Sequence, residues 1–135
     1  MITLNDLTNL ALGVTDRLEV GRLDPLTANL IGATTPIVFL SRESLQHIRH
    51  RHPVLTAEEY LLLPAVIRNG LIIKETRRPT HIVISFQGAE EIRRYITVIK
   101  VTRGGHELYV KTLHRARERQ TKALLTRGRI LRNHK

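Results

Sequence analysis

The spacing of apolar residues changes near residue 70, and this change predicts two kinds of secondary structure. Before that point, most apolar residues recur every three or four positions, which is the period of a helix with one buried face. From Leu71 onward they alternate with polar residues, as in strands with one buried face. The pattern predicts an α+β fold in which N-terminal helices pack on one face of a sheet.

Two predicted helices occupy the first 34 residues. The first begins at the capping residue Thr3, and its apolar stripe extends to Leu18. The second begins after the N-cap Asp24 and stops at Gly32. We therefore expect residues 1–34 to form a small helical appendage.

A short strand and two longer helical segments are predicted next. The apolar run at 37–40 is typical of a strand. Ser41 caps a helix that ends by Pro53, because the residue before a proline disfavours the helical conformation. Thr56 and Glu59 have the spacing of a capping box and start a further helix.

This further helix is expected to be irregular. Pro64 lies inside it and predicts a kink or a break into two parts, because proline lacks an N–H and clashes with the preceding turn. Asn69 and Gly70 end it, and this pair predicts a left-handed C-terminal cap.

Four strand-like runs follow, separated by turn signals that are too short to hold a helix. Short connections require antiparallel neighbours, so we expect a four-stranded antiparallel meander with one face left free. Residues 35–118 would form this domain, and residues 119–135 a basic, helix-compatible tail. The four runs are LIIKETR (71–77), HIVISF (81–86), YITVIKVT (95–102) and ELYVKTLH (107–114).

Charge changes this picture more than overall composition does. The chain has 22 Lys and Arg against 12 Asp and Glu, a net charge of +10. Residues 115–135 hold eight basic residues and one acidic residue, hence +7 of that total. A strongly basic chain favours polyanionic partners, nucleic acid above all.

Several classes of protein are excluded by what the sequence lacks. No run of about 18 apolar residues is present, so we expect no membrane span. The chain has no cysteine, which excludes disulfides, thiolate metal sites and thiol nucleophiles. It also lacks a recognisable signal peptide. We therefore expect a cytoplasmic site of action, reached directly or by delivery into a target cell without a cleaved signal.

The segment SLQHIRHRHPVL contains three histidines, which could bind a metal, transfer protons or decorate a basic helix. His47 and His50 have the spacing of two zinc ligands on a helix, but no third ligand motif accompanies them. Arg49 and Arg51 would also repel a cation. We expect no metal and no cofactor.

Acid–base catalysis of RNA cleavage suits these histidines better than metal binding does. The ribose 2′-hydroxyl can act as nucleophile without a metal, provided that a base, an acid and phosphate-binding groups surround it. Histidine suits the first two roles because its ordinary pKa lies near 6.5. On the last strand, alternation predicts Val110, Thr112 and His114 on one face and Lys111 on the other.

The segment SRESLQHIRHRHPVLTAEEYLLLPAVIRNG, followed by LIIKE, resembles the phage-encoded branch of the barnase–EndoU–colicin–RelE (BECR) nuclease superfamily. The resemblance covers residues 37–118, or roughly 60% of the chain. It implies a metal-independent ribonuclease with helices against a four-stranded antiparallel sheet, a toxin or phage-linked effector in many relatives, some with a neutralising partner. The matching positions are His47, His52-Pro53, Pro64-Ala65-Val66, Lys100 in TVIKV, and Thr112 with His114 in VKTLHRA.

These residues lead to one assignment of roles. We expect His47 or His52 to be the general base, His114 to be the acid, and Lys100 and Thr112 to hold the phosphate. Additional positive charge at the phosphate would come from Arg49, Arg51, Lys74, Arg115 and Arg117.

The expected activity is endonucleolytic cleavage of tRNA, rRNA or mRNA to a 2′,3′-cyclic phosphate, and an antitoxin or immunity protein is the expected protein partner. The main alternative is a basic nucleic-acid-binding module without catalysis. Such a module would more often carry surface aromatics for base stacking, and the chain has three Tyr, two Phe and no Trp. A structural or assembly protein and a phosphate-binding enzyme of another kind are further alternatives.

Overall fold

The computed structural model describes residues 2–88 and 93–134. Its centre is a seven-stranded sheet with the order β1-β2-β6-β5-β4-β3-β7, antiparallel except where β2 runs parallel to β6. The strands are β1 (Arg17–Arg22), β2 (Ile37–Ser41), β3 (Leu71–Glu75), β4 (His81–Gln87), β5 (Arg94–Val101), β6 (Leu108–Ala116) and β7 (Gly128–Arg132).

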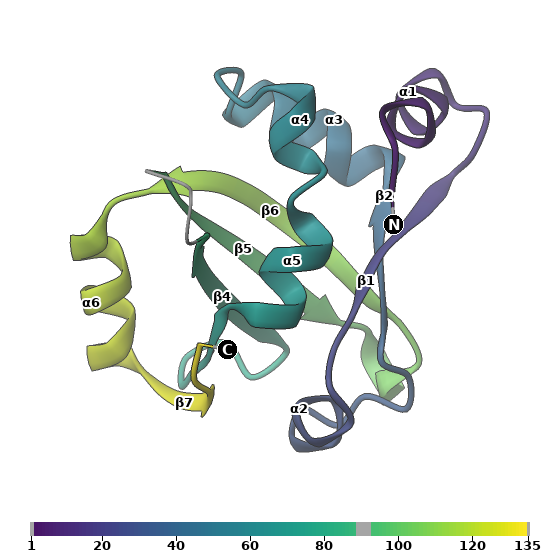
Figure 1. Cartoon of the computed structure of the whole chain (residues 1–135). Helices are drawn as coiled ribbons and strands as arrows, with labels where there is room; N and C mark the ends of the chain where they lie inside the picture. Colours follow the sequence, from purple (N-terminus) through teal and green to yellow (C-terminus); the bar gives the residue numbers. More distant parts are fainter. Residues whose placement is uncertain (1, 89–92, 135) are drawn as a thin grey trace.

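Six α-helices and one turn of 3₁₀ helix accompany this sheet in the described part of the chain. Figure 1 shows α5 across the sheet and α6 at its opposite side. The helices are α1 (Leu4–Leu12), α2 (Pro25–Leu30), α3 (Arg42–Arg51), α4 (Ala57–Tyr60), α5 (Leu63–Asn69) and α6 (Glu118–Arg127), and the 3₁₀ turn spans Arg103–Gly105.

Both faces of the sheet bury apolar side chains. Alternation along β3 sends Ile72 into the main core, together with residues from α1, α3 and α5. Its neighbour Ile73 packs on the opposite face with Val83, Ile96 and Leu124 of α6. We call these the main face and the α6 face.

The α+β class is therefore as predicted, while the sheet is larger than a four-stranded meander. Strands β3 to β6 do form a consecutive antiparallel meander. The expectation of four strands is wrong because β1 and β2 extend the sheet beside β6, and β7 extends it beside β3.

The first 34 residues differ from the predicted pair of helices. Gly13 adopts a left-handed conformation at φ +80° and ends α1, so the expected continuation to Leu18 is wrong. Leu18 instead lies in β1, which pairs with β2. Leu7 and Leu10 are buried in the main core, so this segment packs on the main face of the sheet.

The predicted helices between residues 41 and 70 are present, with one correction at their end. The Ser41 hydroxyl and the Thr56 capping box begin α3 and α4, and Pro64 lies in the first turn of α5 after a break. Gly70, however, is extended at φ −72°, not left-handed. A Cβ there would clash with the Ile84 side chain, so close packing on β4 requires the glycine.

The basic tail forms α6 and β7. Because α6 packs on one face of the sheet, the expectation that this face is free is wrong. Leu124 packs on the α6 face, and the Thr121 and Ser85 hydroxyls lie 2.7 Å apart beneath the helix. α6 contacts β3, which leaves the β5–β6 part of this face less covered. No helix in the described ranges has the length and apolar character needed to cross a membrane.

Candidate active site

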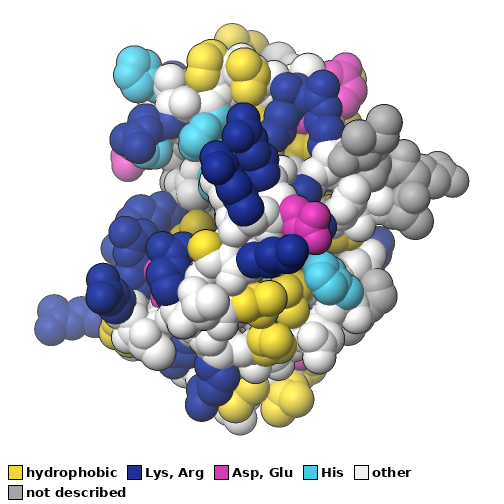
Figure 2. All heavy atoms as spheres, turned by 90° about the vertical axis from the view of Figure 1, so that its left-hand side faces the viewer, with side chains coloured by type: hydrophobic (Ala, Val, Ile, Leu, Met, Phe, Trp, Pro, Cys, Tyr) yellow, Lys and Arg dark blue, Asp and Glu magenta, His cyan; other side chains and the backbone are white. Residues whose placement is uncertain are grey.

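Five residues predicted for the site line one pocket of about 390 Å³, although they come from two segments far apart in the sequence. We call it the histidine pocket. Figure 2 views the side on which α6 lies, where Lys and Arg side chains gather with His among them. The pocket is lined by His47, Arg51, His52, Arg78, Val98, Lys111, Thr112 and His114.

Helix α3 supplies one wall because it lies beside β6. β2 pairs with β6 only at Val38 and Phe39, and α3 follows β2 directly and packs against the remainder of β6. Leu45 and Ile48 are fully buried, which fixes the rotation of the helix. His52 is the C-terminal cap, with its N–H bonded to the Ile48 carbonyl at 2.7 Å.

A β-bulge in β6 supplies the opposite wall. Val98 of β5 faces Thr112 and the next residue faces Val110, so Lys111 is an extra residue in β6. Consequently Val110 points into the main core, while Lys111 and Thr112 both line the pocket. The predicted separation of Lys111 from Thr112 is thus wrong, because a bulge interrupts the alternation on which it depended. Thr97 secures the bulge by donating to the Thr112 carbonyl at 2.8 Å.

His52 and His114 are the central pair of the pocket. Their ring centroids are 5.1 Å apart and the ring planes are inclined by 30°. Nδ1 of His114 lies 3.0 Å from the Arg115 carbonyl oxygen. A carbonyl only accepts, so Nδ1 carries the hydrogen and Nε2 is left to exchange a proton.

The environment of His52 favours its neutral form. Partial burial lowers its pKa below the ordinary 6.5, and the nearby positive charges of His114, Arg51 and His47 lower it further. At neutral pH this imidazole is therefore an available proton acceptor.

The pocket is rich in cations without carboxylate partners. Arg51, Arg78 and Lys111 make no ion pair with any described carboxylate. Lys111 Nζ lies 3.3 Å from Nε2 of His81. An ammonium only donates, so His81 accepts there and is neutral, consistent with its pKa, which burial and the charges of Lys111, Arg78 and Lys100 lower.

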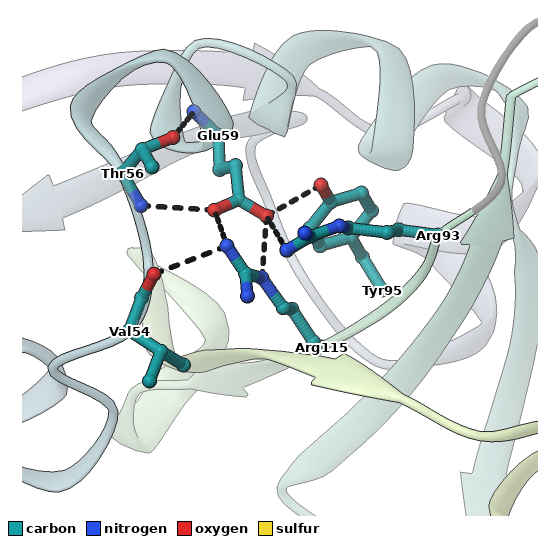
Figure 3. Close-up of polar contacts among 6 residues, drawn as sticks. All are labelled: Val54, Thr56, Glu59, Arg93, Tyr95 and Arg115. Atoms are coloured by element: carbon teal, nitrogen blue, oxygen red, sulfur yellow. Dashed lines mark hydrogen bonds and ion pairs between the residues drawn. The ribbon is translucent and has the colours of Figure 1, made fainter.

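A second polar cluster lies next to the histidine pocket but has a different charge balance (Figure 3). Arg115 donates from Nε and Nη2 to the two carboxylate oxygens of Glu59, at 2.9 and 2.6 Å, and from Nη2 to the Val54 carbonyl at 3.1 Å. Tyr95 donates to the same carboxylate at 2.6 Å. We call this the Glu59–Arg115 network.

The network holds the carboxylate ionised and fixes the backbone near His52. Hydrogen bonds from Arg115, then from Tyr95 and the Thr56 N–H, lower the Glu59 pKa from 4.5 to about 2 against the opposing effect of burial. Because Val54 follows His52 by two residues and Arg115 follows His114 directly, the network fastens the end of α3 to β6. Arg115, which the sequence predicts as a phosphate ligand, therefore has an anionic partner inside the protein.

Four other predicted residues lie outside the histidine pocket. Lys100 is exposed on β5 opposite His81. Arg49 lies near Tyr60: burial raises the pKa of this phenol, and the positive charge of Arg49 partly opposes that shift. Lys74 is half-buried on β3, and Arg117 precedes α6 in a separate pocket with Arg93 and Arg94.

The sequence did not predict three residues in or beside the histidine pocket. Arg78 and Lys111 line it, and His81 contacts Lys111. Arg78 and His81 belong to the turn and strand after β3, which the sequence marks only as a turn signal and an alternating run. Recognising the bulge would have placed Lys111 in the pocket. A bulge is defined by the pairing of two strands, so the sequence of one strand does not reveal it.

In residues 2–88 and 93–134, no group of three or more His, Asp or Glu side chains is arranged to hold a metal ion. Comparisons with family models, with characterised proteins and with solved structures found no match.

Proposed function

We propose that the protein is a metal-independent endoribonuclease whose active site is the histidine pocket. The observation that supports this most strongly is the meeting of His52 of α3 with His114 and Thr112 of β6 in one cationic pocket. Two imidazoles can take and give protons, and the cations can stabilise a charged phosphorane-like transition state.

In this mechanism His52 is the general base, because its lowered pKa keeps it neutral. It takes the proton of the ribose 2′-hydroxyl as that oxygen attacks the phosphorus. His114, when protonated, donates from Nε2 to the leaving 5′-oxygen as the P–O bond breaks. The products are a 2′,3′-cyclic phosphate and a free 5′-hydroxyl, so atoms and protons balance.

The phosphate would be held by the groups around this pair. The Thr112 hydroxyl and the Lys111 ammonium come from the bulge, and Arg51 and Arg78 flank it. His47 lines the same pocket and its charge lowers the His52 pKa, so it acts as an additional cation when protonated. Lys100, near His81, would add to the positive potential at a greater distance.

The proposal is tested by incubating total RNA and purified tRNA with the protein in EDTA. We expect cleavage products that end in 2′,3′-cyclic phosphate. His52→Ala or His114→Ala should lower the rate about a hundredfold or more, because each removes a proton-transfer group. Thr112→Val should lower it less, since the cations remain.

His50→Ala is the matched control, because His50 is an exposed histidine on the same helix that does not line the pocket. It should leave cleavage unchanged. Absence of cleavage by the wild-type protein, or wild-type activity in the His52→Ala and His114→Ala variants, would contradict the proposal.

The alternative is a binding module for nucleic acid that performs no chemistry. It is supported by the same unpaired arginines, which would hold phosphates whether or not the histidines transfer protons. Tight, salt-sensitive RNA binding without cleavage by any variant would favour it.

The BECR resemblance further supports a toxin or phage-linked effector role with a neutralising protein partner. Inhibition of growth on expression, relieved by His114→Ala, is the expected result. An equally toxic His114→Ala variant would contradict that role.

A further inference from the structure

A second basic pocket adjoins the histidine pocket. Its volume is about 540 Å³, and it lies between the β3–β4 turn and the end of α6. Arg78 lines both pockets, so the two lie next to each other on either side of this residue. We call it the arginine pocket; it is lined by Glu75, Thr76, Arg77, Arg78, Thr126, Arg127 and Gly128.

The arginine pocket carries an excess of positive charge. Three of its lining residues are arginines, and one is acidic. Arg77, Arg78 and Arg127 are exposed, and none makes an ion pair with a described carboxylate. Their guanidinium groups are therefore free to bind an external anion.

The backbone of this pocket is fixed by contacts across the sequence. The Thr76 hydroxyl and N–H both donate to the Arg127 carbonyl, at 3.2 and 3.4 Å. Next to this contact, Glu75 pairs with Gly128 in the sheet. Arg77 and Arg127 are thus presented from two anchored segments.

We propose that the arginine pocket binds a backbone phosphate of the same RNA strand whose scissile phosphate occupies the histidine pocket. This inference rests on the proposed function, because it takes the histidine pocket as the cleavage site. It assigns the substrate class as single-stranded RNA longer than a dinucleotide.

The chemistry of the lining favours phosphate over bases as the ligand. Arginine binds phosphate through two parallel N–H donors. The hydroxyls of Thr76 and Thr126 donate to backbone carbonyls, so the arginines are the groups that would hold the phosphate. No Phe, Tyr or Trp lines either pocket, so neither offers the aromatic faces on which bases stack. Binding should therefore depend on strand length and salt more than on base identity.

A single strand suits the two pockets better than a duplex. The histidine pocket is lined by Val98 and Thr112 of the sheet as well as by side chains of α3 and Arg78 of the β3–β4 turn. A flexible strand can bend to place one phosphate there and another beside Arg127, whereas a duplex holds its backbone in a fixed helix.

The test measures binding of 2′-O-methyl RNA, which lacks the nucleophilic hydroxyl and is not cleaved. The probes are a dinucleotide and an oligonucleotide of about eight nucleotides. Arg77→Ala/Arg127→Ala should weaken binding of the longer probe about tenfold and leave the dinucleotide unaffected. The slope of log affinity against log salt should fall by about 0.7 for one lost phosphate contact.

Arg22→Ala/Arg68→Ala is the matched control. It removes the same charge from another pocket, of about 510 Å³, beside β1 and α5. We expect it to change neither affinity. Equal weakening by both double variants would mean general attraction by charge, and equal loss for both probes would place the arginines at the cleavage site; either result overturns the inference.

The two proposals fail separately. If the wild type cleaves RNA but Arg77→Ala/Arg127→Ala binds the longer probe normally, the arginine pocket is not a subsite and the nuclease stands. If length-dependent binding is lost in that variant but no RNA is cleaved, the binding site stands without the proposed catalysis.

Discussion

His114 and Arg115 are neighbours on β6, yet they belong to regions with different charge balance. Arg115 is neutralised by Glu59, whose side chain is 10% exposed, and every oxygen of that carboxylate accepts a hydrogen bond. His114 faces a pocket in which Arg51, Arg78 and Lys111 make no ion pair with a described carboxylate.

The difference separates a structural role from a binding role. A charge that is satisfied within the protein stabilises the fold and has little left to offer a ligand. Cations held near one another without counterions raise the free energy of the empty pocket and favour an anion in it. Substitutions in the Glu59–Arg115 network should therefore change the free energy of unfolding, and substitutions in the histidine pocket should change RNA binding and cleavage.

The largest stability effect is expected from Arg115→Ala. It leaves the buried Glu59 carboxylate without its main partner and should lower the free energy of unfolding clearly more than His114→Ala does. His114→Ala, one residue away, should change it by less than about 1 kcal/mol. Urea unfolding of both variants makes the comparison, and similar losses would contradict it.

Acidification should weaken the same network. The Glu59 pKa is about 2 when folded against an ordinary 4.5, so its contribution is present above pH 4.5 and is lost as the pH falls toward about 2. At about 1.4 kcal/mol per pKa unit this amounts to at most about 3.5 kcal/mol.

Glu59→Gln lacks this ionisation and serves as the comparison. The stability difference between wild type and Glu59→Gln should be largest at neutral pH and should shrink in acid. A difference that does not change with pH would show that the carboxylate charge contributes nothing.

The smallest expected effect concerns the pH dependence of cleavage. A base must be neutral, so activity falls as the pH drops through the His52 pKa. Arg51→Gln removes a positive neighbour, raises that pKa and should move the acidic limb of kcat/KM to higher pH. Histidine NMR titration checks the same shift directly.

Arg49→Gln removes the same charge from the same helix, outside the pocket. It should leave the acidic limb in place. Equal shifts in the two variants would mean that general charge, not the pocket, sets the His52 pKa.

Local signals predicted local structure well. Ser41, Thr56 and Pro64 each act through groups within a few residues, and the helix boundaries that they predict between residues 41 and 69 are present. The strands between residues 71 and 116 were also predicted from the sequence, because the turns that separate them lie close by along the chain.

Features that depend on distant partners were not predictable in this way. β1 becomes a strand because β2 pairs with it, although its Leu18 also fits a helical stripe. The bulge at Lys111 depends on the register between β5 and β6. The pairing of Arg115 with Glu59 joins residues 56 positions apart, so composition alone suggested a free cation.

The outermost strands of the sheet bear on the solubility of the molecule. β7 covers the strand that begins with Leu71–Ile73, and an uncovered apolar strand of this kind offers its N–H and C=O groups to a second copy of the chain. β7 itself carries Arg129, which is exposed and makes no ion pair with a described carboxylate, whereas Arg132 pairs with Asp24. Like charges on approaching strands repel, so Arg129 opposes pairing of β7 with a second copy. This positive charge thus helps to keep copies of the protein apart, independently of any nucleic acid.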